Sequence, residues 1–146
     1  MKARAAALAI LGPLWVLTGL ASPALAQYKA AYAASPVTRM AAGDTVTVPL
    51  KVSNTGTTEW KNTGRCAVVL GYHWFKGSTL VASETEAAPL PGPVGPGQTV
   101  ELTATVNVPE TPGSYVLAWD MRAQCEWFTK LGAAAGRQPI EVVPKQ

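Results

Sequence analysis

The sequence predicts an all-β fold, an immunoglobulin-like antiparallel β-sandwich of about seven to nine short strands. Several segments alternate apolar and polar residues with a period of two, which is typical of strands with one buried face. Clusters of Gly, Pro, Asn and Asp separate these segments roughly every eight to twelve residues, and such clusters favour turns. No segment sustains the helical period of about 3.6 residues. A closed β-barrel is the alternative architecture for strands of this spacing.

Residues 1–26 are predicted to be a secretory signal peptide and not part of the fold. Lys2 and Arg4 precede an apolar run, and a triplet of the small-x-small type, Ala-Leu-Ala, follows at residues 24–26. These are the three regions of a signal peptide. A membrane anchor is the alternative, but Gly and Pro interrupt the run, which is short for a bilayer span of about 20 residues. Cleavage after Ala26 would leave residues 27–146, a suitable length for one domain.

The segment before the first strand, residues 27–35, is predicted to be a flexible N-terminal arm, because it is rich in Ala and has no strong period. The sandwich domain is then expected to span residues 36–146. Its first strand is expected at residues 36–40, where the leading Pro suits a sheet edge. Residues 45–53 alternate strictly and are rich in β-branched side chains, which predicts a strand with one buried face.

The middle of the chain is expected to hold a central strand and a rigid connection. Residues 66–75 carry apolar side chains on both faces, which favours a central position in a sheet. Residues 79–82 can add a short strand after a turn. Residues 83–97 contain four prolines and three glycines, which exclude a helix or a central strand. This segment is therefore predicted to be a crossover connection within one domain.

The last third of the chain is expected to contain four more strands. Residues 98–108 alternate as clearly as the earlier strand, and residues 114–122 follow a Pro-Gly turn. Tyr115 lies just inside that strand and resembles a tyrosine corner, in which the phenol anchors a connection between strands. A short strand is expected at residues 125–130 and a final one at residues 139–143.

The two cysteines, Cys66 and Cys125, are predicted to form a disulfide. An even cysteine count in an exported chain indicates a disulfide, and two free thiols are the alternative. In an Ig-like sandwich the third main strand lies antiparallel beside the penultimate one. Cys66 opens the first of these and Cys125 follows the second, so the topology brings the pair together. Closing a loop of about 60 residues would contribute about 4 kcal/mol in the chain-entropy model.

Five segments carry a resemblance to a known family. They are NTGTTEW at 54–60, LGYHW at 70–74, PGQTV at 96–100, TPGSYVLAWD at 111–120 and WF at 127–128. In this order, the chain resembles the four-tryptophan (FW) domain, the Ig-like domain of Nbr-type autophagy cargo receptors and of bacterial secreted proteins. The resemblance implies a β-sandwich that binds proteins without catalysis. It does not carry a role in autophagy to this chain, and the cysteine pair is not part of the family pattern.

The residue types needed for catalysis or metal binding are sparse. His73 is the one histidine, which a Ser-His-Asp site would require, but a packed histidine on a strand face is the simpler interpretation. A copper site of His73 with Met40 or Met121 is conceivable, although the sequence has no close cluster of such ligands. We therefore expect no enzyme, no metal and no cofactor. The charges are scattered without a basic run, which argues against nucleic acid as a partner.

Of the four tryptophans after the signal peptide, Trp74 and Trp119 lie on the inward faces of central strands and are expected in the core. Tyr72 and Tyr115 lie on the same faces and are expected there too. Trp60 follows a turn, and Trp127 stands next to the expected disulfide. Each of these two either closes an end of the sandwich or belongs to an exposed aromatic binding patch.

The function expected from these patterns is a non-catalytic module that binds a protein or peptide, or that has a structural role in a bacterial envelope. It would be secreted, periplasmic or at the cell surface, and would not span the membrane after signal cleavage. Binding would use loops at one end or the addition of a strand to an exposed sheet edge. The alternative is a carbohydrate-binding module, with polysaccharide as the partner of exposed aromatics.

Overall fold

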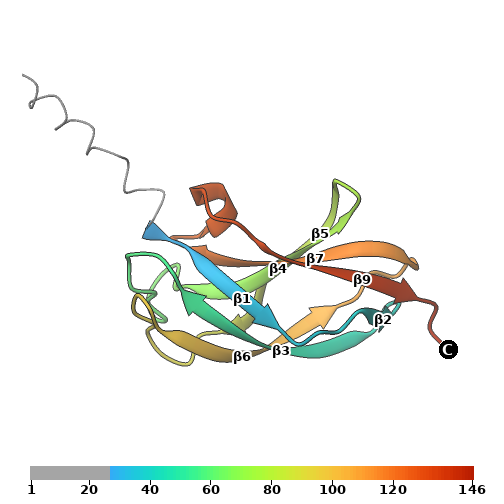
Figure 1. Ribbon diagram of the computed structural model, residues 1–146, viewed down its shortest axis with the longest axis horizontal. Coiled ribbons are helices and arrows are strands. Elements are labelled where there is room, and N and C mark those ends of the chain that lie inside the picture. Colours follow the sequence, from blue (N-terminus) through green and yellow to red (C-terminus); the bar gives the residue numbers. More distant parts are fainter. Residues whose placement is uncertain (1–26) are drawn as a thin grey trace, which may run out of the picture.

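The computed structural model describes residues 27–146, which form two β-sheets packed face to face (Figure 1). The signal peptide predicted for residues 1–26 lies outside the described residues. The three-stranded sheet has the order β1 (Ala30–Ala34), β3 (Thr45–Asn54), β6 (Thr99–Asn107). The six-stranded sheet has the order β2 (Arg39–Ala41), β9 (Gly136–Val143), β7 (Gly113–Ala123), β4 (Val69–Lys76), β5 (Thr79–Pro89), with β8 (Glu126–Trp127) paired to β7. The predicted Ig-like β-sandwich is confirmed.

Antiparallel pairing dominates both sheets and follows the alternation in the sequence. In the three-stranded sheet, Leu50 of β3 lies opposite Leu102 of β6, and Val52 lies opposite Val100. Leu50 and Val52 are buried while their strand neighbour Lys51 is exposed, so the period of two separates the core face from the solvent face. In the described part of the chain, β2 alone pairs in parallel, with β9.

The centre of the sandwich is aromatic. Tyr72, Trp74, Tyr115 and Trp119 are each at most 6% exposed. The Tyr72 ring lies edge-on to Trp74 and to Trp119, with ring centroids 6.5 and 6.2 Å apart. The Tyr115 hydroxyl donates a hydrogen bond to the Thr111 carbonyl at 2.6 Å, which is the tyrosine corner expected from the sequence.

The N-terminal arm expected to be flexible is instead partly a strand. Ala30–Ala34 forms β1, which pairs antiparallel with β3. Tyr32 fixes it, because the Tyr32 hydroxyl accepts a hydrogen bond from the Met121 N–H at 3.0 Å. The Tyr32 ring also lies against Gly136, where a Cβ atom would come within 2.7 Å of it. Alanines on both faces of β1 hide its period in the sequence.

Other elements also differ from their predicted bounds, and β5 and β8 differ most in kind. β5 continues to Pro89, whereas the sequence indicated a connection from residue 83 onward. Pro89 is the last residue of β5, and β5 is an edge strand, where a proline is tolerated because its missing N–H can face away from the sheet. The short strand expected at residues 125–130 is only two residues long, and a 3-10 helix, η2 (Phe128–Leu131), follows it.

The turn after β3 is organised by Asn54, whose side chain is fully buried. Asn54 Nδ2 donates to the carbonyls of Thr58 and Val94, both at 3.0 Å, and Oδ1 accepts from the Gly56 N–H at 3.0 Å. Trp60 and Val94 exchange backbone hydrogen bonds of 2.8 and 3.0 Å. One amide side chain therefore ties the turn that carries Trp60 to the distant connection between β5 and β6.

The disulfide Cys66–Cys125 is present, with the two Cα atoms 4.8 Å apart. Cys125 and Gln124 are the two central residues of the hairpin between β7 and β8, and both have positive φ (59° and 55°). This is the type I′ geometry that matches the twist of two-residue hairpins. The hairpin folds β8 back along β7, and this places Trp127 over the outer face of the six-stranded sheet.

Candidate functional site

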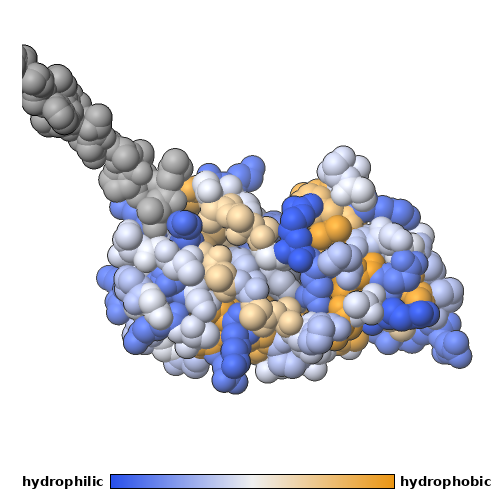
Figure 2. Space-filling model, viewed as in Figure 1, coloured by the Kyte–Doolittle hydropathy of each residue, from blue (hydrophilic) through white to orange (hydrophobic). Residues whose placement is uncertain are grey.

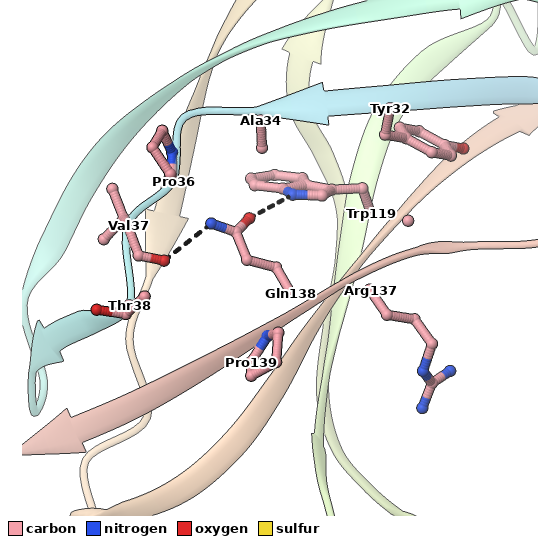
Figure 3. A pocket seen from close by; sticks show the side chains of 10 residues that line it. Tyr32, Ala34, Pro36, Val37, Thr38, Trp119, Arg137, Gln138 and Pro139 are labelled. Carbon is pink, nitrogen blue, oxygen red and sulfur yellow. Dashed lines mark hydrogen bonds between the residues drawn. The ribbon is translucent and has the colours of Figure 1, made fainter.

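A first hollow of the sandwich has a structural role. It has a volume of about 250 Å³ and lies where the segment after β1 crosses β9 (Figure 3). Its central polar groups satisfy one another. Trp119 Nε1 donates to Gln138 Oε1 at 3.0 Å, and Gln138 Nε2 donates to the carbonyls of Ser35 and Val37 at 2.9 and 3.0 Å. The Gln138 amide thus holds the chain after β1 against the core.

The second hollow, which we call the sheet-face groove, lies on the outer face of the six-stranded sheet. It runs between η2 and the tip of the β4–β5 hairpin, the two elements that rise from the sheet in Figure 1. Its volume is about 320 Å³, and orange, hydrophobic side chains stand on the hairpin beside the hollow in Figure 2. The lining side chains come from five elements and from the loop before β9: His73, Phe75, Leu80, Ser83, Trp127, Thr129, Lys130, Ala135 and Arg137.

Trp127 forms one wall of the groove. Its ring lies over Gly71 of β4, where a Cβ atom would be 2.8 Å from two ring carbons. The His73 ring meets Trp127 edge-on with centroids 4.3 Å apart, and the Arg122 guanidinium lies 5.2 Å from the Trp127 centroid. A cation over an indole face is favourable by about 0.5–1 kcal/mol at an exposed site. Trp127 remains half-buried, so part of the ring is accessible.

A chain of hydrogen bonds crosses the floor of the groove from one strand to the next. Ser83 Oγ lies 2.7 Å from His73 Nδ1, and His73 Nε2 lies 2.9 Å from Asp120 Oδ2. Thr129 of η2 donates to the same carboxylate, from its hydroxyl at 2.6 Å and its N–H at 3.2 Å. Asp120 is fully buried and His73 is 8% exposed, while Ser83 is exposed.

The direction of these hydrogen bonds follows from the chemistry of the groups. An ionised carboxylate only accepts, so His73 Nε2 must carry the proton that faces Asp120. In the neutral imidazole, Nδ1 then has a free lone pair and accepts from the Ser83 hydroxyl. The Ser83 proton is therefore aimed at a histidine base whose other nitrogen is oriented by a carboxylate.

The charged side chains that line the groove are cationic, above the buried carboxylate of Asp120. Lys130 and Arg137 are exposed and line it, and the Arg137 guanidinium lies 5.4 Å from the centroid of Phe75. Figure 3 shows Arg137 pointing away from Gln138, its neighbour on β9, so the two side chains serve opposite faces of the strand. Among the residues that line the groove in the described part of the chain, none is acidic.

Trp60 is not part of the groove. Its side chain is fully buried and its ring meets Phe128 edge-on with centroids 5.6 Å apart, so it closes one end of the sandwich. Its Nε1–H is buried without a hydrogen-bond partner among residues 27–146. Of the two tryptophans that the sequence left open, Trp127 is therefore the one that can contact a ligand.

Residues 34–131 match the family model described as the Ig-like domain from next to BRCA1 gene. The chain belongs to this Ig-like family. The matched span contains His73, Ser83, Asp120 and Trp127, and it ends before Arg137. No curated protein sequence matches this Ig-like domain. In the described residues, no helix has the length and the apolar character needed to cross a membrane.

Two solved structures resemble this Ig-like domain at low identity. The CARDB domain of a Pyrococcus furiosus protein is 12% identical, with a TM-score of 0.44 and coverage of 80% of this chain and 95% of that one. A PapD-like domain of human CEP192 is 13% identical, with a TM-score of 0.34 and coverage of 86% and 91%. Likeness at this level indicates nothing about ligands or activity.

The cluster of Ser83, His73 and Asp120 was not predicted from the sequence. His73 stands out in the sequence as the one histidine, but the fold alone brings its partners to it, since His73 of β4 pairs with Ser83 of β5 and with Ala118 of β7. A usable signal was present, because an alternating strand places His73 and Gly71 on the face opposite Tyr72 and Trp74. A glycine on the outward face of a strand leaves space above the sheet, and a side chain from another element can fill that space beside the histidine.

Proposed function

We propose that this Ig-like domain is an exported, FW-type interaction module whose sheet-face groove binds a peptide segment of a partner protein. The observation that carries the proposal is the exposure of Leu80, which lines the groove and is 54% exposed. Its neighbour Val81, which does not line the groove, is 47% exposed, and these two are the exposed large hydrophobic side chains among residues 27–146. Exposed apolar side chains that adjoin a hollow with a polar rim are typical of interaction sites.

The chemistry of the groove selects the kind of segment. Phe75, Leu80 and Trp127 offer an apolar surface for one large side chain, while Lys130 and Arg137 favour a negative charge beside it. Complementary charge contributes to specificity and to the rate of association. The expected ligand is therefore an apolar or aromatic residue adjacent to Asp, Glu or a C-terminal carboxylate.

The shape of the β5 edge favours a ligand that inserts a side chain into the groove over a ligand that adds a long strand to the sheet. β5 ends the order of the six-stranded sheet, so its outer edge is free for pairing. Register shifts interrupt its pairing with β4 between Leu70 and Tyr72 and between Trp74 and Phe75. Bulges of this kind twist an edge strand and limit pairing with another chain. Any strand addition would be short and would accompany the apolar contact in the groove.

The FW assignment and the export assignment belong to the same proposal. The four tryptophans that define the resemblance have separate roles, with Trp74 and Trp119 in the core, Trp60 closing an end and Trp127 beside the groove. A disulfide is stable in oxidising compartments, which supports an extracytoplasmic location. N-terminal sequencing of the processed protein should begin at Gln27, and an intact Met1 on the exported protein would contradict the proposal.

The test of binding is selection from a random peptide library on the oxidised protein. We expect the selected peptides to share an apolar residue next to an acidic one, and Leu80→Ser to weaken them about 10-fold or more. Arg137→Glu should also weaken them, whereas Lys51→Glu makes the same charge change on the other sheet and should not. Peptides without this pattern, or equal binding by Leu80→Ser, would contradict the groove as the site.

A carbohydrate ligand is the second candidate, favoured by the accessible part of the Trp127 ring. Sugars stack on exposed indoles, so binding would shift the tryptophan fluorescence of the protein. Titration with a panel of oligosaccharides, compared between wild type and Trp127→Ala, separates the two candidates. A saturable shift that Trp127→Ala abolishes would replace the peptide by a polysaccharide as the ligand.

A further inference from the structure

We propose that Ser83 is an activated nucleophile, and that the sheet-face groove reacts with carboxylic esters that have an apolar acyl group. The inference goes beyond binding and rests on the side-chain positions of Ser83, His73 and Asp120. The three residues lie on the adjacent strands β5, β4 and β7, so the sheet itself holds them in line. Sites built on strands are held more rigidly than sites on loops.

The geometry satisfies the two hydrogen bonds that activation requires. Ser83 Oγ lies 2.7 Å from His73 Nδ1, within the distance over which a base removes a proton. Asp120 Oδ2 lies 2.9 Å from His73 Nε2 and fixes the tautomer, so Asp120 is a positioning residue. Thr129 holds the carboxylate from the other side, and the edge-on Trp127 ring limits rotation of the imidazole.

The nucleophile is accessible, whereas its partners are shielded. Ser83 is exposed and lines the groove, while Asp120 is fully buried. Phe75 and Leu80 supply apolar contacts for an acyl chain. Lys130 and Arg137 place positive charge at the same hollow, where negative charge develops on the carbonyl oxygen during acyl transfer.

The reaction balances without a further reagent except water. Ser83 Oγ attacks the ester carbonyl carbon, its proton passes to His73 Nδ1, and the carbonyl π electrons become a lone pair on oxygen. When the carbonyl re-forms, the bond to the alkoxy oxygen breaks, and that oxygen takes the proton from His73 and leaves as an alcohol. Water then attacks the acyl-Ser83 ester with the same proton transfers, which releases the carboxylic acid and restores Ser83.

The competing explanation is that the three side chains only tie neighbouring strands together. Both explanations predict the same hydrogen bonds, but only activation predicts a serine that reacts faster than other exposed serines. Ser78 in the turn between β4 and β5 is exposed as well, and it provides the matched control.

The experiment treats the exported, disulfide-bonded protein with a fluorophosphonate probe and locates the label by peptide mass spectrometry. We expect labelling at Ser83, abolished in Ser83→Ala, reduced at least about 10-fold in His73→Gln and unchanged in Ser78→Ala. Hydrolysis of 4-nitrophenyl butyrate should follow the same order. Absence of label at Ser83 in the folded wild type, or equal labelling of Ser78, would overturn the proposal.

A thiol in place of the hydroxyl gives a second measurement that does not depend on these variants folding equally well. The thiol of Ser83→Cys should react with iodoacetamide faster than that of Ser78→Cys, and its pH profile should lie at lower pH because a neighbouring imidazole favours the thiolate. Equal rates and equal pH profiles would show that His73 does not act on position 83. Peptide binding is measured separately, so failure here leaves the proposed binding function unaffected.

Discussion

The ring of Trp127 lies on Gly71, and a Cβ atom at Gly71 would come within 2.8 Å of two carbons of that ring. The same Cβ would be 2.4 Å from the Glu84 carbonyl oxygen on β5. A glycine inside a central strand is ordinarily unfavourable. Here it provides the space that lets a residue from another hairpin cover the sheet and form the wall of the groove.

Replacement of Gly71 by Ala should therefore destabilise the domain and displace Trp127. Overpacking of this kind costs about 1–3 kcal/mol. We expect a lower midpoint of urea unfolding together with stronger acrylamide quenching of tryptophan fluorescence. Gly92→Ala is the control, because no heavy atom of residues 27–146 other than its neighbours lies within 4 Å of a Cβ there. Equal midpoints for the two variants would contradict the proposed packing.

Asn54→Asp should destabilise the domain more than Asn54→Ala at neutral pH, although Asp has nearly the shape of Asn. Asn54 donates to two carbonyls in a buried site, and a carboxylate would place negative charge against both of them. Loss of the hydrogen bonds alone costs about 1–3 kcal/mol for each polar group left unpaired. Thermal unfolding at pH 7 and pH 4 measures the effect.

Protonation of the introduced carboxyl at low pH should restore part of the stability of Asn54→Asp but not of Asn54→Ala. Asn62→Asp makes the same chemical change at a half-buried loop residue and should have little effect. An Asn54→Asp protein as stable as wild type would show that the amide does not hold the turn.

Tyr32 should make the protein sensitive to alkali. Burial and, to a smaller extent, the Asp120 charge raise the pKa of Tyr32 above its ordinary value of about 10, despite the hydrogen bond from Met121. A raised pKa in the folded state means that this contribution to stability is present below pH 10 and is lost as the pH rises further. The expected loss is about 1.4 kcal/mol per pH unit in that range.

Tyr32→Phe cannot ionise, and it also leaves the buried Met121 N–H without its partner, at a cost of about 1–3 kcal/mol. It should be less stable than wild type at pH 7, and the difference should narrow above pH 10. Chemical denaturation between pH 7 and pH 11 checks both statements. A difference that stays constant with pH would mean that Tyr32 ionises equally easily in the folded and unfolded chains.

Trp60→Ala should cost about 3–5 kcal/mol of unfolding free energy, as truncation of a fully buried indole does. Trp60→Phe should cost less, because the Trp60 Nε1–H has no hydrogen-bond partner among the described residues to lose. Guanidinium unfolding of the three proteins gives the order. A Trp60→Ala protein that is as stable as wild type but has lost peptide binding would make Trp60 a contact residue instead.

The strands with strict alternation were predictable because their pattern is local. Thr45–Asn54 and Thr99–Asn107 agree with their predicted bounds within one residue at each end. β1 was not predictable, because alanines on both of its faces give no alternation between apolar and polar residues. Its position is fixed by Tyr32, whose hydroxyl binds the N–H of Met121, 89 residues away. The predicted strand at residues 79–82 was too short, because the prolines from residue 89 onward suggested an irregular connection. Pro89 is in fact the last residue of β5, and the other prolines of the segment follow the strand.

Of the side chains at the candidate site, the sequence singled out Trp127 and His73, and it left the role of Trp127 open. Trp127 could be named from the sequence as a possible contact, but the choice between Trp127 and Trp60 depended on burial. The association of Ser83, His73 and Asp120 could not be predicted without the register of β4 against β7 and against β5. The β4–β5 register also contains shifts that simple alternation does not anticipate.

The sequence by itself determined the fold class, the core aromatics and the pairing of Cys66 with Cys125, because each follows from local periodicity combined with a common topology. Tertiary structure decided where the groove lies and which polar groups meet in it. A strand of period two states which side chains point outward, but not which strand lies beside it or which hairpin folds over it. The neighbouring strand and the covering hairpin are decided by packing between residues far apart in the sequence, such as the contact between Gly71 and Trp127.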